Sequence, residues 1–345
     1  MLSRLSNGAT LRHGATALVA VAAALGLAAC GSSSPSSSSS TSKPLNIAYL
    51  SFAVENSYDA PMLAAATAVA DESHANLKVF DANSSAQTQY SQLQDAITSG
   101  QYNGIIVQPI VGTGLIGLVK AAIAKGIKVV NLDQILGPNL STDEPQVKGL
   151  SANVTFVPTK IGTQLGQLVV QACESNNLNP CNVGYLYDIK ASALDMAISG
   201  AFDKAINADP AVQVVAEGQS YFSPTTGLTA VQAMLQAQPK LNLIVGSDQG
   251  IEGGAQALAA AHLTGKIILV GYGASAAALQ GIASGTWYAD VAQAPAREGR
   301  LAMQAMIAAL QTGKASGAIN PVAGLPDNGI VTKANVGQFT AEWAG

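Results

Sequence analysis

The stretch QYNGIIVQPIVGTGLIGLVKAAIAKGIKVVNLD, residues 101–133, predicts the fold of this chain. It contains two short runs rich in β-branched residues, GIIVQPI and IKVVNLD, on either side of a longer Ala- and Leu-rich segment that fits a helix. The two runs are continuously apolar and do not alternate, which is typical of parallel strands covered by helices on both faces. The stretch therefore predicts a strand–helix–strand unit of an α/β protein.

The same alternation continues in both directions from this unit. The further strand candidates are, in chain order, LNIAYLS, LKVFDAN, NVGYLYD, VQVVAEGQ, LNLIVGSD, IILVGYG and TWYADVAQ. One series of strand–helix units precedes residue 134, and a second begins near Asn182. Between them lie the turn-rich GPNLSTDEPQ, a predicted domain change near Asn153 and a helix from Pro158 to about Asn176. We expect two doubly wound, Rossmann-like parallel-sheet domains.

The N-terminal region has the layout of a secretory signal. Residues 1–29 combine a basic start with an apolar stretch at 15–29 that is too short to span a bilayer. LAAC, residues 27–30, resembles the lipobox of bacterial lipoproteins, in which the cysteine becomes the lipid-bearing N-terminus. An ordinary signal peptide with an incidental cysteine is the alternative, but the small residues and the Ser-rich tract at 30–44 favour Cys30 as a lipid anchor followed by a flexible tether.

Composition limits the possible partners. The chain carries 17 basic and 21 acidic residues, a net charge of −4, and removing residues 1–29 takes away two arginines and no acid, which leaves 15 − 21 = −6. Nucleic-acid binding requires a basic face, so we do not expect a nucleic-acid partner. At 48% hydrophobic and 11% charged residues, the chain has ample material for buried cores.

Two cysteines remain after Cys30 is assigned to lipid. Cys173 and Cys181 are eight positions apart, and outside the cytoplasm such a pair favours a disulfide. A metal pair is the alternative, but no histidine stands at ligand spacing around them. We therefore expect a disulfide, no metal and no cofactor.

Polar and aromatic residues follow the predicted strands at the edge where open parallel sheets bind ligands. They are Glu55, Asn56, Ser57, Tyr58, Asp59, Asp133, Gln134, Asp188, Lys190, Tyr221, Phe222, Ser247, Asp248, Gln249 and Gln293. Each alone also fits a helix cap or a turn. Because amides and carboxylates bind hydroxyl groups and aromatic rings cover the C–H face of a sugar, their agreement over several loops favours a small polyhydroxylated ligand.

The sequence resembles the ribose-binding-like (type I) periplasmic binding proteins, the solute receptors of bacterial ABC sugar importers. The resemblance covers residues 45 to about 312. It rests on LNIAYLSFAVENSYDAPMLAAATAVAD, the stretch at 101–133, GLTAVQAMLQAQPKLNLIVGSDQGIEGGAQALAAA, IILVGYGASAAALQGIASG and YADVAQAPAREGRLAMQAMIAAL.

The resemblance implies that the chain crosses three times between two lobes. The three crossing segments would form the hinge. One lobe would comprise residues 45–152 and 294–320, and the other residues 153–293 and 321–345. The two lobes would close around a ligand in the cleft between them by a hinge motion, as periplasmic binding proteins do.

Site residues are also implied by the resemblance, one position at a time. The implied ligand-binding residues are Asn56, Tyr58, Asp133, Gln134, Asp195, Phe222, Ser247 and Gln293. Two positions depart from the family pattern: Ile198 aligns with a usual arginine, and Gly273 with the usual sugar-binding aspartate. Asp195, one turn before Ile198, would partly replace the hydrogen bonding of that arginine.

These observations predict a non-enzymatic, monomeric solute-binding lipoprotein that delivers a neutral sugar or polyol to an ABC transporter permease and touches the membrane through Cys30. An enzyme is disfavoured because GYGASA at 271–276 lacks the third glycine of a dinucleotide site and no phosphate-binding loop or nucleophile elbow occurs. A transcription regulator would need a DNA-binding head. A sensor subunit that binds a nucleoside, a signal or another small solute and reports to a membrane receptor stays open.

Overall fold

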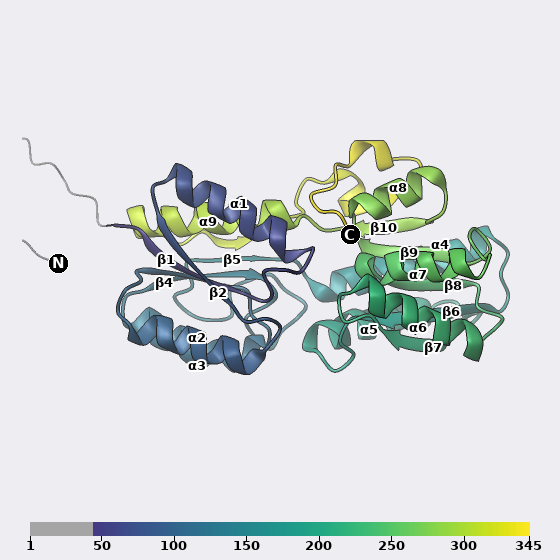
Figure 1. Ribbon diagram of the computed structural model, residues 1–345, viewed down its shortest axis with the longest axis horizontal. Helices are drawn as coiled ribbons and strands as arrows, with labels where there is room; N and C mark the ends of the chain where they lie inside the picture. Colours follow the sequence, from purple (N-terminus) through teal and green to yellow (C-terminus); the bar gives the residue numbers. More distant parts are fainter. Residues whose placement is uncertain (1–43) are drawn as a thin grey trace, which may run out of the picture. The chain divides into compact units, whose positions relative to one another are not determined.

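The structure of the protein is a computed structural model that describes residues 44–345 (Figure 1). The predicted signal peptide, Cys30 and the tether up to residue 43 lie outside the described residues. The described elements form two six-stranded sheets, each with helices on both faces. The predicted fold class, two doubly wound domains built on parallel sheets, is confirmed.

The first sheet is parallel throughout, with strand order β2-β1-β3-β4-β5-β11. Its strands are β1 (Asn46–Ser51), β2 (Asn76–Asp81), β3 (Gly104–Val107), β4 (Lys128–Asp133), β5 (Ala152–Thr155) and β11 (Gly317–Ile319). Alternate residues of β1 show why its sequence is continuously apolar. Tyr49 packs in the core beneath one pair of helices and Leu50 in the core beneath the other, so both faces are buried.

Two pairs of helices cover this sheet. One face carries α1 (Asp59–Glu72) and α9 (Pro295–Thr312), and the opposite face carries α2 (Ala86–Thr98) and α3 (Gly112–Ala124) (Figure 1). The helix α9 lies far along the chain from the other three, yet its Met303 and Met306 share a core with Met62 of α1.

The second sheet repeats this strand order as β7-β6-β8-β9-β10-β12, with only β12 running antiparallel to its neighbour β10. Its strands are β6 (Cys181–Tyr187), β7 (Val212–Gln219), β8 (Leu243–Ser247), β9 (Ile268–Gly273), β10 (Ala289–Ala292) and β12 (Ile330–Thr332).

The helices of the second sheet pack as two layers, with α4 and α5 against one face and α6, α7 and α8 against the other. Their bounds are α4 (Pro158–Ser175), α5 (Ala193–Ile206), α6 (Pro224–Ala237), α7 (Asp248–Ala260) and α8 (Ala276–Ser284). Two short 3₁₀ helices, η1 (Pro326–Gly329) and η2 (Val336–Gln338), flank β12.

A disulfide joins Cys173, near the end of α4, to Cys181 at the start of β6. Both cysteines are buried in the core between α4, α5 and the second sheet. The predicted pairing is therefore present, and it closes the short connection from helix to strand.

The chain crosses three times between the sheets, after β5, after β10 and after β11. The first crossing follows Thr155, because β5 pairs with β4 in the first sheet. It therefore comes a few residues after the domain change that the sequence predicted near Asn153. We call the part built on the first sheet, with α9, the first lobe, and the part built on the second sheet the second lobe.

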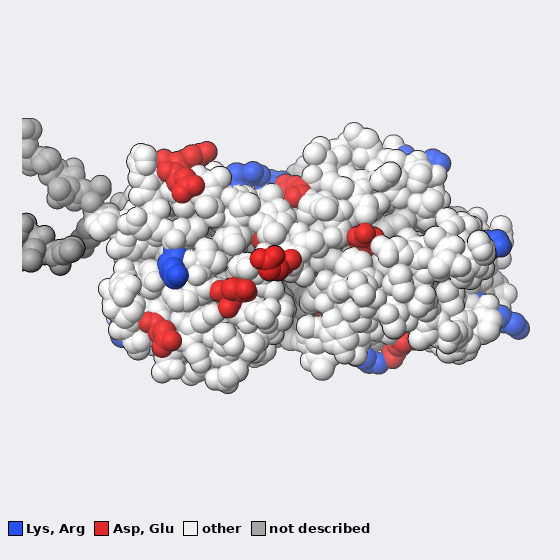
Figure 2. Space-filling model, in the orientation of Figure 1, with Lys and Arg blue, Asp and Glu red and all other residues white. Residues whose placement is uncertain are grey.

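Charged side chains are sparse on the face shown in Figure 2, and most of that surface is uncharged. Among residues 44–345, no helix is both long and apolar enough to cross a membrane.

Candidate functional site

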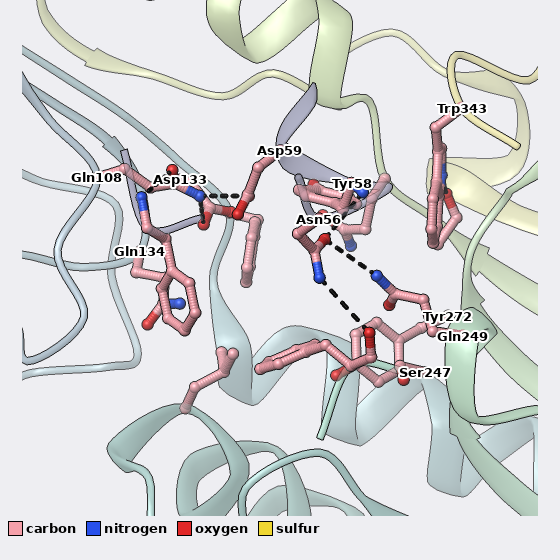
Figure 3. Close-up of a pocket in the computed structure, with 16 residues that line it drawn as sticks. Asn56, Tyr58, Asp59, Gln108, Asp133, Gln134, Ser247, Gln249, Tyr272 and Trp343 are labelled. Carbon is pink, nitrogen blue, oxygen red and sulfur yellow. Dashed lines mark hydrogen bonds between the residues drawn. The ribbon is translucent and has the colours of Figure 1, made fainter. Parts of the chain in front are cut away.

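A cavity lies between the two lobes, at the carboxyl ends of strands from both sheets (Figure 3). The space between its lining residues amounts to roughly 550 Å³, part of which is open to solvent. The residues that line it are Phe52, Asn56, Tyr58, Asp59, Gln108, Asp133, Gln134, Phe156, Leu194, Phe222, Ser247, Gln249, Tyr272, Gly273, Gln293 and Trp343. Aromatic rings and uncharged polar groups dominate this lining, and it includes two carboxyl groups but no lysine or arginine.

Most of the predicted ligand-binding residues are brought together here. Those that line the cavity are Asn56, Tyr58, Asp133, Gln134, Phe222, Ser247 and Gln293. They come from the ends of strands in both sheets and the loops that follow, so the rule that ligands sit beyond the carboxyl ends of parallel strands locates this cluster correctly.

Asp195 is the exception, because it lies outside the cavity lining. Its carboxylate accepts hydrogen bonds from the backbone N–H groups of Asp188 and Ile189, at 2.9 and 3.0 Å, and from the Ser192 hydroxyl at 2.9 Å. It therefore holds the loop between β6 and α5 instead of facing a ligand.

Ile198 does not face the cavity either. It is buried in the core between α4 and α5, where its backbone oxygen packs against Gly162. Leu194, one turn earlier on α5, is the residue of this helix that lines the cavity. The α5 side chain that reaches the cavity is therefore the apolar Leu194, and Ile198 does not contribute to the lining.

The first-lobe wall of the cavity is organised by one amide. The side-chain nitrogen of Gln108, the residue after β3, donates to Asp59 Oδ1 at 2.6 Å and to Asp133 Oδ2 at 3.1 Å. Its side-chain oxygen accepts from the backbone N–H of Phe52 at 3.0 Å. Two carboxyl groups from α1 and β4 therefore meet at a single neutral donor, as Figure 3 shows.

A third buried carboxyl group lies behind this pair. Glu298, in the first turn of α9, accepts a hydrogen bond from the Tyr58 hydroxyl at 3.1 Å. Burial, followed by the charge of Asp133, raises the pKa of Glu298 well above its usual range. Burial, followed by the charge of Asp133, also raises the pKa of Asp59 to about 8, and burial raises that of Asp133 to about 7. Because removal from water and mutual repulsion both disfavour ionisation, this wall holds protons near neutral pH and suits an uncharged ligand.

These pKa shifts predict that the protein becomes less stable as the pH rises. A carboxyl group whose folded pKa is raised binds more protons in the folded state, so stability falls between the usual pKa near 4 and the folded value. For Asp59 the decline should continue to about pH 8, at up to about 1.4 kcal/mol per pH unit. We expect Asp59→Asn to flatten the decline in melting temperature between pH 6 and pH 8. Asp71→Asn, an exposed change on the same helix, is the control and should keep the wild-type slope. Equal slopes of melting temperature against pH for the wild type and both variants would contradict the raised pKa of Asp59.

The second-lobe wall is fixed by Asp188, a buried residue that follows β6. Its carboxylate accepts hydrogen bonds from the hydroxyl groups of Ser220 and Ser247, both at 2.5 Å, and from Tyr272 at 2.6 Å. Burial is the main cause that raises the pKa of Asp188, to about 6. Ser247 and Tyr272, which both line the cavity, are thereby held in place, and their oxygen atoms keep lone pairs that a ligand hydroxyl could use.

Direct contacts between lining residues join the two lobes. The Gln249 side-chain nitrogen of the second lobe donates to Asn56 Oδ1 at 3.2 Å, and Asn56 Nδ2 lies 3.5 Å from the backbone oxygen of Phe222 (Figure 3). The rings of Phe52 and Phe222 meet edge to face with centroids 6.1 Å apart. The described arrangement is therefore one in which residues of both lobes enclose the same space.

One acceptor of the lining is left without a donor. Gln293, which follows β10, is 7% exposed, and none of the described residues donates a hydrogen bond to its buried side-chain oxygen. Since an unpaired buried acceptor costs free energy, this atom is a favourable partner for a ligand hydroxyl.

Several lining residues were not among the predicted ligand-binding residues: Phe52, Asp59, Gln108, Phe156, Leu194, Gln249, Tyr272, Gly273 and Trp343. The strand-end rule could have found Gln108, which directly follows GIIV, and it did flag Asp59 and Gln249 as members of their loops. No motif marks Trp343, which lies far from any strand end in the sequence.

The comparisons with known proteins agree with this architecture. Residues 47–315 match the Periplasmic binding protein domain family, and the chain belongs to that family. Proteins of this kind bind solutes and are not enzymes.

The similarity to individual proteins of known function is lower than 30% in sequence identity. The chain is 27% identical over 236 residues to the D-allose-binding periplasmic protein of Escherichia coli (strain K12), covering 65% of this chain and 70% of that protein. It is 25% identical over 233 residues to the ribose import binding protein RbsB of Bacillus subtilis (strain 168), covering 66% and 69%. Among solved structures, a solute-binding protein of an ABC transporter from Bacillus halodurans C-125, bound to myo-inositol, superposes with a TM-score of 0.75 at 18% identity. It covers 88% of this chain and all of its own, which supports the fold.

Proposed function

We propose that this protein is an extracytoplasmic solute receptor that captures a neutral sugar or polyol between its lobes. The protein would act as a monomer and deliver this ligand to the permease of an ABC importer. The ligand would bind in the cavity described above, against Asn56, Tyr58, Asp133, Gln134, Phe222, Ser247 and Gln293. The relatives named for allose and ribose bind the same class of compound according to their names.

The observation that carries this proposal is the chemistry of the cavity. Amide, carboxyl and hydroxyl groups point into it from both lobes, while aromatic rings supply flat apolar faces. A sugar or polyol presents the complementary pattern of hydroxyl groups and C–H faces. An anion would find no lysine or arginine in this lining. A cation would find less negative charge than two ordinary carboxylates supply, because burial raises the pKa of Asp59 to about 8 and that of Asp133 to about 7.

A thermal-shift screen of the purified protein tests the function. The panel should hold neutral pentoses, hexoses and polyols at millimolar concentration, with nucleosides, D-glucosamine and an amino acid as contrasting classes. A ligand present at a thousandfold its Kd stabilises the folded state by about 4 kcal/mol, which gives a clear rise in melting temperature. A response confined to nucleosides, amines or amino acids would contradict the proposed ligand class. Silence across the panel would favour the alternative of a sensor for another solute.

Attachment to the membrane through Cys30 is a further part of the proposal, supported by LAAC at 27–30 and by the Ser-rich tract that follows. More than one acyl chain gives stable anchoring, since each buried methylene contributes about 0.8 kcal/mol. We expect Cys30→Ser to move the protein, expressed with its own signal in a bacterial host, from the membrane fraction to the soluble fraction. Detergent phase partitioning measures this. Continued partitioning of the variant into the detergent phase would exclude the anchor.

A further inference from the structure

Trp343, in the segment Ala341–Gly345, forms part of the cavity wall. The backbone oxygens of Trp343 and Ala344 accept hydrogen bonds from the N–H groups of Ala276 and Ala277, at 2.9 and 3.1 Å. These donors lie in the first turn of α8, where backbone N–H groups have no partner within the helix. The segment is therefore held by main-chain bonds that do not depend on its side chains.

Trp343 lies beside Gly273, at the end of β9. Its indole nitrogen donates to the Gly273 backbone oxygen at 2.8 Å, and only 6% of the residue is exposed. A Cβ atom at position 273 would lie 2.5 Å from a ring carbon of Trp343 and 2.8 Å from the carboxyl carbon of Asp248. The φ of Gly273 is also +147°, in the range that favours glycine. No side chain fits at position 273 while the indole stays in place.

The contact between Trp343 and Gly273 determines which chemical groups one end of the cavity presents to a ligand. Gly273 and Trp343 both line the cavity, and the only polar hydrogen of the indole is already donated to Gly273. Trp343 therefore presents ring carbons to the cavity. A ligand hydroxyl buried against this surface would lose its water partners without finding a new one, whereas a C–H group would gain contact with the ring.

The same segment also contacts the first lobe. The rings of Trp343 and Tyr58 meet edge to face, with centroids 5.3 Å apart, and Tyr58 is one of the proposed ligand-binding residues. The Glu342 carboxylate accepts a hydrogen bond from the backbone N–H of Arg297, in the first turn of α9, at 2.8 Å. The indole is thus fixed between the two lobes, beside a crossing of the chain.

We propose that Trp343 is a specificity-determining residue, which selects ligands that present C–H groups and not hydroxyl groups at the Gly273 end of the cavity. This inference rests on the proposed function and narrows the ligand class to sugars or polyols with one locally deoxygenated or apolar face.

The position of Trp343 is tested first without any ligand. The chain has two tryptophans, so Trp287→Phe leaves Trp343 as the only tryptophan, which can be excited selectively at wavelengths that tyrosine does not absorb. We expect blue-shifted emission and strong protection from acrylamide in this variant. Should Trp287→Phe, a change in a buried core, fail to fold, the difference between wild-type and Trp343→Phe spectra gives the same information. Emission typical of a solvated indole would overturn the proposal.

Selectivity is tested with matched pairs of sugars that differ by one hydroxyl group: D-galactose with D-fucose, L-mannose with L-rhamnose, and D-ribose with 2-deoxy-D-ribose. For at least one pair we expect the wild-type protein to bind the deoxy sugar on the order of tenfold more tightly. Trp343→Ala should reduce that ratio to about one, while Trp343→Phe, which keeps an aromatic face, should preserve most of it. Isothermal titration calorimetry measures the affinities.

The outcomes separate this inference from the proposed function. Binding of hydroxylated partners as tightly as deoxy partners, or a preference unchanged in Trp343→Ala, would overturn the role of Trp343 and leave a sugar receptor. Failure of every sugar and polyol in the thermal-shift panel would remove the proposed function, and the role of Trp343 with it.

Discussion

Replacing Gly299 with alanine should destabilise the protein by at least about 3 kcal/mol, more than a typical overpacked core position. A Cβ atom at this position of α9 would lie 1.8 Å from the backbone oxygen of Met62 in α1. Backbone in the middle of a helix cannot rotate away as a side chain can, so the two helices would have to separate. They pack over the same face of the first sheet, and Tyr58 and Glu298, which are hydrogen-bonded to each other, lie at their beginnings. Separation of the two helices should therefore also disturb the ligand-binding cavity.

A matched glycine shows that the effect comes from this contact. Gly117 lies in the interior of α3, is exposed, and would place a Cβ atom with nothing within 4 Å. Gly117→Ala should stabilise the protein by about 0.5–1 kcal/mol, because alanine loses less conformational entropy in a helix than glycine does. Urea unfolding followed by circular dichroism measures both changes. Similar unfolding midpoints for the two variants would show that the α1–α9 approach is looser than described.

Replacing Phe222 with alanine should weaken binding of the sugar or polyol roughly 10- to 100-fold while changing the melting temperature of the free protein little. Phe222 lines the cavity from the second lobe and meets Phe52 of the first lobe edge to face. A buried aromatic face contributes about 1.5–3 kcal/mol, which corresponds to that range of affinity. The cost to the free protein should be small because Phe222 is only partly buried and packs at the margin of its core.

Tyr221 provides a control from the same turn. Tyr221 and Phe222 have φ values of +52° and +54°, so an alanine at either position meets the same backbone strain. Tyr221 is 55% exposed and does not line the cavity. Tyr221→Ala should therefore leave the affinity unchanged. Calorimetric titration with the best ligand of the panel measures the affinity of both variants. Equal affinities in Phe222→Ala and the wild type would remove Phe222 from the site.

The sequence allows the lobes and half of the site to be predicted for a simple reason. Continuously apolar strands occur where both faces of a parallel sheet are buried, and the residues that follow such strands converge at one edge. Asn56, Asp133, Ser247 and Gln293 were located in this way. Their convergence requires only the strand order and direction, which the alternation of strands and helices supplies.

The remaining residues depend on tertiary packing that no local pattern encodes. Asp195 lies in the first turn of α5, where its carboxylate binds backbone N–H groups of the loop that follows β6. An acidic residue in a first turn fits such a structural role as well as a ligand contact. Ile198 turns toward α4, whereas Leu194, four residues earlier, reaches the cavity. Trp343 comes to the site only because residues after β12 return across α8, a path that its own sequence does not signal.

The interleaving of the lobes has a consequence for how the chain folds and how it can be divided. One face of the first sheet is covered only by α1 until α9 is available, and the edge strand β12 of the second sheet follows β11 of the first sheet in the chain. Neither lobe is a continuous piece of chain, so no single cut yields two fragments that each hold one complete lobe and nothing else. Closing such long loops slows folding. We expect that engineered single-lobe versions would need two or more segments rejoined by new linkers, and that fragments ending before residue 295 would not fold into a stable first lobe.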